Sequence, residues 1–173
     1  MAMEKRVCET ISSMLKDRGS EIPEFNFLDE VNIFDNVMIV YINSDKLGVQ
    51  HVKVVEKYIE EYKKTTNILI YKTTVTSFAK NAITDLPCEV ELFSLDELCF
   101  NITKHYLVPE HILLSSEEKK RILNKYMVSE NKMPMLNRTD PVCRYFNAKP
   151  GTMFKIVRKS FTTVASMYYR IVA

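Results

Sequence analysis

Two cysteines and two histidines are the side chains of this sequence best suited to binding a metal ion: Cys99, His105, His111 and Cys143. Zinc ribbons and fingers take their thiolate and imidazole ligands in tight pairs, such as two cysteines separated by two residues. These four residues form no such pair. We therefore predict no metal site and no cofactor, and we interpret both histidines as polar residues flanking a strand-like segment at 107–109.

Covalent and phosphodiester chemistry are no better supported. Nucleophilic catalysis needs a Cys or Ser beside a base, with an oxyanion hole that is usually made at a tight glycine turn. This sequence has only three glycines and no GxSxG pattern. A nuclease core of the α/β type places an acidic residue two positions before a lysine, where it helps to hold a divalent cation. Here the strand reads Ile70-Tyr71-Lys72, with an aliphatic residue in that position. We predict no catalytic residue.

The composition is that of a globular protein with one ordinary domain or two small ones. Of its 173 residues, 46% are hydrophobic and 27% are charged. The first ten residues carry charges with no apolar run behind them, so we expect no secretory signal. No segment approaches the roughly 18 apolar residues that span a bilayer. The cysteines form no CxxC pair, and we read them as buried thiols of a protein in the cytosol or nucleus.

Charge is distributed unequally along the chain. Residues 1–100 contain 11 lysines and arginines and 17 acidic residues, a net charge of −6. Residues 101–173 contain 13 and 5, a net charge of +8. Such asymmetry suggests two regions with different partners. The basic half could face nucleic acid or an acidic protein surface, or its cations could simply solvate a small domain.

The first half has the alternating pattern of an α/β unit. Apolar residues at helical spacing predict a helix over 7–15 that ends near Gly19, and further helices over 52–64 and 77–84. Segment 20–36 is interpreted as a loop. The strands are expected at 37–42, 68–71 and 88–93. Strands that alternate with helices predict a largely parallel sheet.

The second half predicts a small α+β module. A capping-box pattern at Ser115 to Glu118 begins a helix that continues to about residue 126. Asp140 and Pro141 fit the N-cap and first position of a short helix that extends to residue 146. The strands 153–157 and 168–172 could pair as a hairpin. The junction lies near Phe100, which gives two modules at 1–97 and 101–173.

Residues of the second half also match, in order, a known family over about 70 residues. The matching segments are Asn101-Ile102-Thr103, His105, Leu107 to His111, Thr139 to Val142, Arg144-Tyr145-Phe146, Gly151, Lys155-Ile156, Arg158 and Tyr169 to Val172. They closely resemble the assembly domain of the fifth subunit of eukaryotic nuclear RNA polymerases, which is shared by polymerases I, II and III. A small component of the archaeal RNA polymerase is related to this family and covers that same domain.

The first half resembles the jaw domain of that family more weakly and in a shortened form. The similar segments are Asp17-Arg18-Gly19, Lys46 to Val49, Ala79-Lys80 and Glu91-Leu92-Phe93. The resemblance implies a jaw that is like restriction endonucleases in fold but inactive, followed by a small α+β assembly domain. It implies a non-catalytic subunit of DNA-directed RNA polymerase in the nucleus, with no membrane contact and no homo-oligomer. The alternatives are a nuclease-like enzyme and a free nucleic-acid-binding protein.

In this family the assembly domain docks on the largest polymerase subunit, among other subunits, and the jaw lies beside downstream DNA. The partner-docking residues implied here are His105, Pro109, His111, Asp140, Pro141, Arg144, Tyr145, Lys155, Arg158 and Arg170. Guanidinium groups can make bidentate bonds, so the three arginines are the contact candidates. Asp140 and Pro141 are expected to shape the surface as a helix cap. The DNA-proximal residues implied are Thr76, Ser77 and Lys80, with only a weak DNA contact.

Two segments depart from the family pattern. The usual Thr-Pro-Ser-Ala run of the jaw is here Thr76-Ser77-Phe78-Ala79, so the rigid proline is absent. The usual glycine and glutamate that follow the arginine of the C-terminal segment are absent from residues 159–166. These departures bear on the DNA contact and on the local docking contacts, respectively.

Overall fold

The computed structural model describes residues 2–20, 22–23, 25, 29–158 and 166–173. The chain divides into two compact units, Met1–Phe100 and Asn101–Ala173, and each is described by itself. None of the helices in the described ranges combines the length and the apolar character needed to cross a membrane.

A four-stranded sheet is the centre of the N-terminal unit, and its order is β1-β2-β4-β6. The strands are β1 at Val31–Ile33, β2 at Val37–Ile42, β4 at Thr66–Tyr71 and β6 at Val90–Ser94. β2, β4 and β6 run parallel, and only β1 is antiparallel to its neighbour. The apolar runs 37–40 and 68–70 are buried because both faces of the sheet are covered. The predicted, largely parallel sheet is confirmed.

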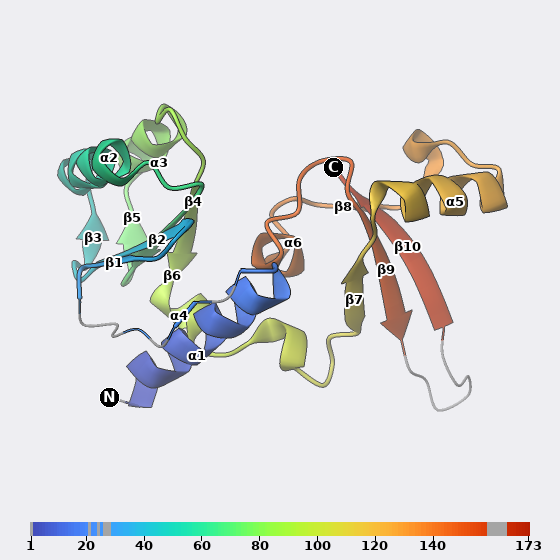
Figure 1. Cartoon of the computed structure of the whole chain (residues 1–173), viewed down its shortest axis with the longest axis horizontal. Coiled ribbons are helices and arrows are strands. Elements are labelled where there is room, and N and C mark those ends of the chain that lie inside the picture. Colours follow the sequence, from blue (N-terminus) through green and yellow to red (C-terminus); the bar gives the residue numbers. More distant parts are fainter. Residues whose placement is uncertain (1, 21, 24, 26–28, 159–165) are drawn as a thin grey trace. The chain divides into compact units, whose positions relative to one another are not determined.

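Helices cover both faces of this sheet (Figure 1). α2 (Val49–Tyr62) and α3 (Ser77–Thr84) lie on one face, whereas α1 (Ala2–Asp17) and α4 (Leu95–Leu98) lie on the other. The apolar stripe of α2 enters a core that it shares with β2, β4 and α3. Two very short strands, β3 (Lys46–Leu47) and β5 (Thr74–Val75), form a separate parallel pair. The three predicted helices are confirmed; α3 has the predicted bounds, whereas the ends of α1 and α2 are shifted.

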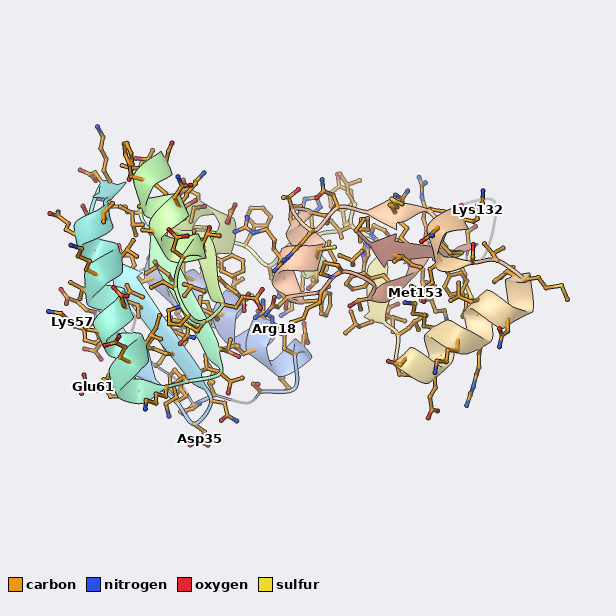
Figure 2. All side chains as sticks on the ribbon, turned by 90° about the horizontal axis from the view of Figure 1, so that it is seen from above. Arg18, Asp35, Lys57, Glu61, Lys132 and Met153 are labelled. Atoms are coloured by element: carbon orange, nitrogen blue, oxygen red, sulfur yellow. The ribbon has the colours of Figure 1, made fainter. Side chains whose placement is uncertain are left out.

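An ion pair joins the end of α1 to the sheet. The Arg18 guanidinium, labelled in Figure 2, donates to both carboxylate oxygens of Glu91 in β6, at 2.9 and 2.8 Å. The two side chains are only 9% and 11% exposed. Parallel hydrogen bonds of this kind fix both distance and orientation. The pair therefore holds the last turn of α1 against β6.

Segment 20–36 was predicted as a loop, and this prediction is wrong for its last part, because β1 occupies 31–33. The strand is three residues long and lies at the edge of the sheet, with Ile33 exposed. An edge strand needs backbone hydrogen bonds on only one side and no continuous apolar run. The sequence signal for a buried strand is therefore missing here.

The C-terminal unit contains a second four-stranded sheet, with the order β7-β9-β10-β8. The strands are β7 at Glu110–Leu113, β8 at Met135–Leu136, β9 at Met153–Arg158 and β10 at Ser166–Val172. β9 and β10 pair antiparallel, which confirms the predicted hairpin. β7 pairs with the other side of β9, whereas β8 runs parallel to the end of β10.

Two helices lie on opposite sides of this sheet in Figure 1: α5 (Ser116–Tyr126) and α6 (Pro141–Tyr145). Both predicted caps are confirmed. The Ser115 hydroxyl accepts from Glu118 N at 3.3 Å, while Ser115 N donates to the Glu118 carboxylate at 2.9 Å. Hydrogen bonds from Ser115 lower the pKa of Glu118 below its usual value. Asp140 Oδ1 accepts from Val142 N at 2.8 Å, with Pro141 in the first turn.

The strand expected at 107–109 is instead found three residues later, at 110–113. Pro109 has no backbone N–H, so it cannot donate to a ladder and the strand begins after it. Two short 3-10 helices, η1 (Ile102–Lys104) and η2 (Glu130–Lys132), complete the unit. The altered segment 159–166 lies outside the described residues except for Ser166.

Candidate docking surface

One face of the C-terminal sheet is only partly covered. α6 packs on the end of this face, where Phe154 and Val172 join Cys143 and Ala148 in a buried cluster. Farther along, the register aligns His111 with Ile156 and Ile156 with Tyr168 across three strands. Side chains alternate between faces along a strand, so Arg158 and Arg170 share this face with them.

The uncovered part forms a pocket of about 410 Å³, which we call the sheet pocket. It is lined by Pro109, His111, Leu136, Ile156, Arg158, Tyr168 and Arg170. Apolar and aromatic side chains make its floor and two guanidinium groups are among its lining, while no carboxylate lines it among the residues that the structure describes. The surface therefore fits an acidic or backbone-rich protein segment better than a cation.

His111 is held in place by two contacts. Its Nδ1 lies 2.7 Å from the carbonyl oxygen of Pro109, so this nitrogen carries the proton and donates. Its ring meets Phe154 edge to face, with ring centroids 6.0 Å apart.

The two arginines of the sheet pocket differ in how they are held. Arg170 Nη1 donates to the carbonyl oxygen of Met135 at 3.1 Å, which ties β10 to β8. Among the described residues, the Arg170 guanidinium forms no ion pair with a carboxylate. Arg158 is exposed at the end of β9. Both cations are consequently available for an incoming partner.

Four of the ten predicted docking residues gather at the sheet pocket: Pro109, His111, Arg158 and Arg170. Lys155 does not, because it lies one residue from Ile156 and points to the opposite face. His105 follows η1 in an exposed loop and stacks on Tyr106, with ring centroids 5.0 Å apart.

The other four predicted docking residues belong to α6. Asp140 and Pro141 form its cap, as described above. Tyr145 is buried, and its hydroxyl accepts a hydrogen bond from Asn101 Nδ2 at 3.2 Å. Arg144 is half-buried in the last turn of the helix. The first three of these side chains therefore have a structural task inside the unit.

Sequence reasoning missed three residues of the sheet pocket: Leu136, Ile156 and Tyr168. Tyr168 is 50% exposed although it lies in the middle of a strand. The sequence contained enough information to predict Tyr168 as a pocket residue, since Tyr168 and Arg170 are two positions apart in a strand and must share a face. No sequence pattern indicated Leu136, because β8 is only two residues long.

The predicted DNA-proximal residues lie at the start of α3. The Thr76 hydroxyl accepts from Ala79 N and donates to the Leu47 carbonyl, each at 3.2 Å, so this side chain caps the helix. Ser77 and Lys80 are exposed, and Phe78 beside them is 79% exposed. Of the three predicted residues, Ser77 and Lys80 are therefore exposed, whereas Thr76 is only partly exposed.

The candidate nuclease position is apolar and inaccessible. Ile70 is fully buried, while Lys72 pairs with Asp45 at 3.1 Å near the surface. In the part of the chain that the structure describes, no group of three or more His, Cys, Asp or Glu side chains is placed to hold a metal ion.

Cys143, buried in α6, should resist alkylation. Burial, with a smaller effect of the Asp140 carboxylate, raises the pKa of its thiol from 9.0 to about 11. Because the thiolate is the reactive form, we expect iodoacetamide at pH 8 to label Cys143 about 100-fold more slowly in the folded chain than in urea. The raised pKa stabilises the fold below about pH 9, and this contribution is lost as the pH rises towards 11.

Peptide mapping by mass spectrometry would measure that labelling rate. Cys8 is an internal reference, since it is only partly buried in the described structure. Equal rates for Cys143 in the folded and unfolded chain would contradict the prediction.

Comparison with known proteins identifies relatives of this chain. The family model described as "RNA polymerase Rpb5, C-terminal domain" matches residues 100–172. The chain is 30% identical over 187 aligned positions to "DNA-directed RNA polymerases I, II, and III subunit rpabc1" of Dictyostelium discoideum, covering 96% of this chain and 95% of that protein. It is 33% identical over 140 positions to the RPABC1 subunits of Caenorhabditis briggsae and Caenorhabditis elegans, covering 80% of this chain and 66% of theirs.

The fold and the sheet pocket are those of a mixed α/β protein with a surface suited to protein contact. The chain belongs to the Rpb5 (RPABC1) family of shared eukaryotic RNA polymerase subunits. The resemblance drawn from the sequence is thereby confirmed.

Proposed function

We propose that this chain is a non-catalytic subunit of a nuclear DNA-directed RNA polymerase and that its C-terminal unit docks on the largest subunit. The observation that supports docking is the sheet pocket, where Arg158 and Arg170 border an apolar floor with no carboxylate among its described lining residues. Interfaces that combine aromatic side chains, arginine and an apolar centre are typical of stable protein contacts. The chain would act as one copy among different subunits, not as a homo-oligomer.

The domain bounds proposed are 1–97 for a jaw and 101–173 for an assembly domain. A parallel sheet with helices on both faces is compatible with a restriction-endonuclease-like jaw, and the buried Ile70 supports an inactive one. Downstream DNA would pass near Ser77 and Lys80, with Thr76 shaping the turn. The net charge of −6 over residues 1–100 favours a weak contact.

The docking proposal is tested by the substitution Arg158→Glu. Reversing this charge places a carboxylate in a pocket suited to acidic or carbonyl groups, and the Arg158 side chain is exposed at the end of β9. We expect a tagged R158E chain to recover the two largest polymerase subunits in a yield lowered by about tenfold or more. Quantitative mass spectrometry of the purified complex would measure this yield.

Lys120→Glu is the matched control, because it makes the same charge change at an exposed position of α5. Its yield should stay within about twofold of the unmodified chain. Equal yields for R158E and K120E would remove the sheet pocket from the docking surface. Failure of the unmodified chain to recover any polymerase subunit would refute the proposed function itself.

A further inference from the structure

β10 is longer than the strand that covers its outer side. It spans Ser166–Val172, but β8 pairs only with Ile171 and Val172. The other neighbour, β9, pairs with β10 from Ser166 to Ile171. Within the described part of the chain, residues 166–170 of β10 therefore have a strand on one side only.

The backbone groups of this edge can be assigned from the hydrogen bonds that follow it. On the β8 side, Ile171 N donates to Pro134 O and Ala173 N donates to Leu136 O, each at 2.9 Å. The direction of successive N–H groups along a strand repeats every two residues. The N–H and C=O groups of Met167 and Tyr169 therefore point to the open side, where described residues supply no backbone partner.

Such an edge is a template for another strand. A surface pocket of about 380 Å³, which we call the edge groove, runs beside it. Its lining residues are Tyr126, Val128, Lys132, Met133, Pro134, Met167, Tyr168, Tyr169 and Arg170. Tyr126 and Tyr169 pack against each other there, with ring centroids 6.0 Å apart. The edge groove therefore offers space for the side chains of an added strand beside the backbone groups of β10 that such a strand would pair with.

The charge of the edge groove is positive. Lys132, labelled in Figure 2 at the end of η2, lines it together with Arg170. No carboxylate lines the groove among the residues described, and Glu130 in the same 3-10 helix is already bound to Lys119 at 2.7 Å. The groove is also continuous with the sheet pocket, because Tyr168 and Arg170 line both.

We propose that the open edge of β10 binds an extended segment of a polymerase partner chain as an added strand, and that this segment alternates apolar with acidic residues. The alternation follows from the two faces of β10. Met167 and Tyr169 point to the α5 side, where an added strand meets apolar side chains, whereas Tyr168 and Arg170 point to the sheet pocket, where it meets arginine. This inference rests on the proposed docking function and names the kind of segment that is engaged.

The test compares two substitutions at one position. Met167→Pro removes the outward N–H that an added strand would use, while the bonds of β10 to β9 come from the alternate residues and remain. Met167→Thr changes the side chain but keeps that N–H. We expect M167P to lower the recovery of the largest polymerase subunit about tenfold and M167T to stay within about twofold.

Hydrogen exchange in the unmodified protein gives an independent readout. The Met167 and Tyr169 amides should exchange at least about tenfold more slowly in the purified polymerase than in the isolated full chain. This measurement also decides the matter if M167P fails to fold. Unchanged exchange of these two amides on assembly, or equal recovery of M167P and M167T, would overturn the added strand.

The two proposals fail in distinguishable ways. If the unmodified chain enters the polymerase and R158E does not, while M167P enters normally, docking stands and strand addition is refuted. If the unmodified chain never enters the polymerase, docking is refuted and strand addition falls with it.

Discussion

Replacing Phe154 by alanine is expected to destabilise the C-terminal unit by about 4 kcal/mol. Phe154 is fully buried in β9, and its ring contacts both His111 and Phe146, with centroids 6.0 and 5.7 Å away. The substitution removes most of an aromatic side chain from the middle of a small core, which can collapse only partly around the cavity. Loss of this magnitude is a large fraction of the stability of a small domain.

Hydrogen exchange of the β9 and β10 amides measures this effect within the C-terminal unit. Phe154→Leu is the appropriate control, since it keeps most of the apolar volume and should cost less than half as much. A change below about 1 kcal/mol for F154A would contradict the packing described here. Because His111 rests against this ring, F154A should also lower recovery of the polymerase subunits.

Replacing Arg18 by methionine is expected to destabilise the N-terminal unit by about 3 kcal/mol. The substitution leaves the Glu91 carboxylate, which is 11% exposed, without the two guanidinium hydrogen bonds of 2.9 and 2.8 Å. Losing one partner of a buried pair costs more than losing both, because the remaining carboxylate stays largely desolvated without these two hydrogen bonds. Urea unfolding monitored by exchange of the β6 amides would measure the change.

The double variant Arg18→Met with Glu91→Leu provides the decisive comparison. Removing both charges should recover at least half of the stability that R18M loses. If the double variant is no more stable than R18M, the cost arises from lost packing of the arginine stem and not from the hydrogen bonds that the Glu91 carboxylate loses.

The larger elements of both units could be predicted from local sequence patterns. β2 and β4 have buried apolar runs, α2 has a clear helical stripe, and α5 begins with a capping box. These signals lie within single segments and do not depend on distant partners. The same holds for the β9–β10 hairpin, whose strands are rich in apolar and aromatic residues.

The strands that sequence reasoning missed are short and are defined by their partners. β3, β5 and β8 are two residues long, and β1 is three. So few residues show no periodicity, and their pairing depends on chain segments that tertiary packing brings together. β7 was misplaced because Pro109 was counted as part of a strand, although it has no N–H to donate.

The residues of the candidate site could likewise be predicted only where local sequence was sufficient, and not where strand pairing decides. The family resemblance named Arg158, Arg170 and His111, but it could not tell that Lys155 points away from them. That distinction needs the strand register, because a shift of one residue moves a side chain to the other face of the sheet. Tyr168 was missed for the same reason.

The position of Ile70 limits which substitutions this chain can accept. Its side chain is fully accommodated inside the central sheet, two residues before Lys72. A charged aspartate placed there would lose its hydration, which costs several kcal/mol. A single mutation could not introduce an acidic ligand at this position without a large loss of folding stability, because the packing around residue 70 is apolar.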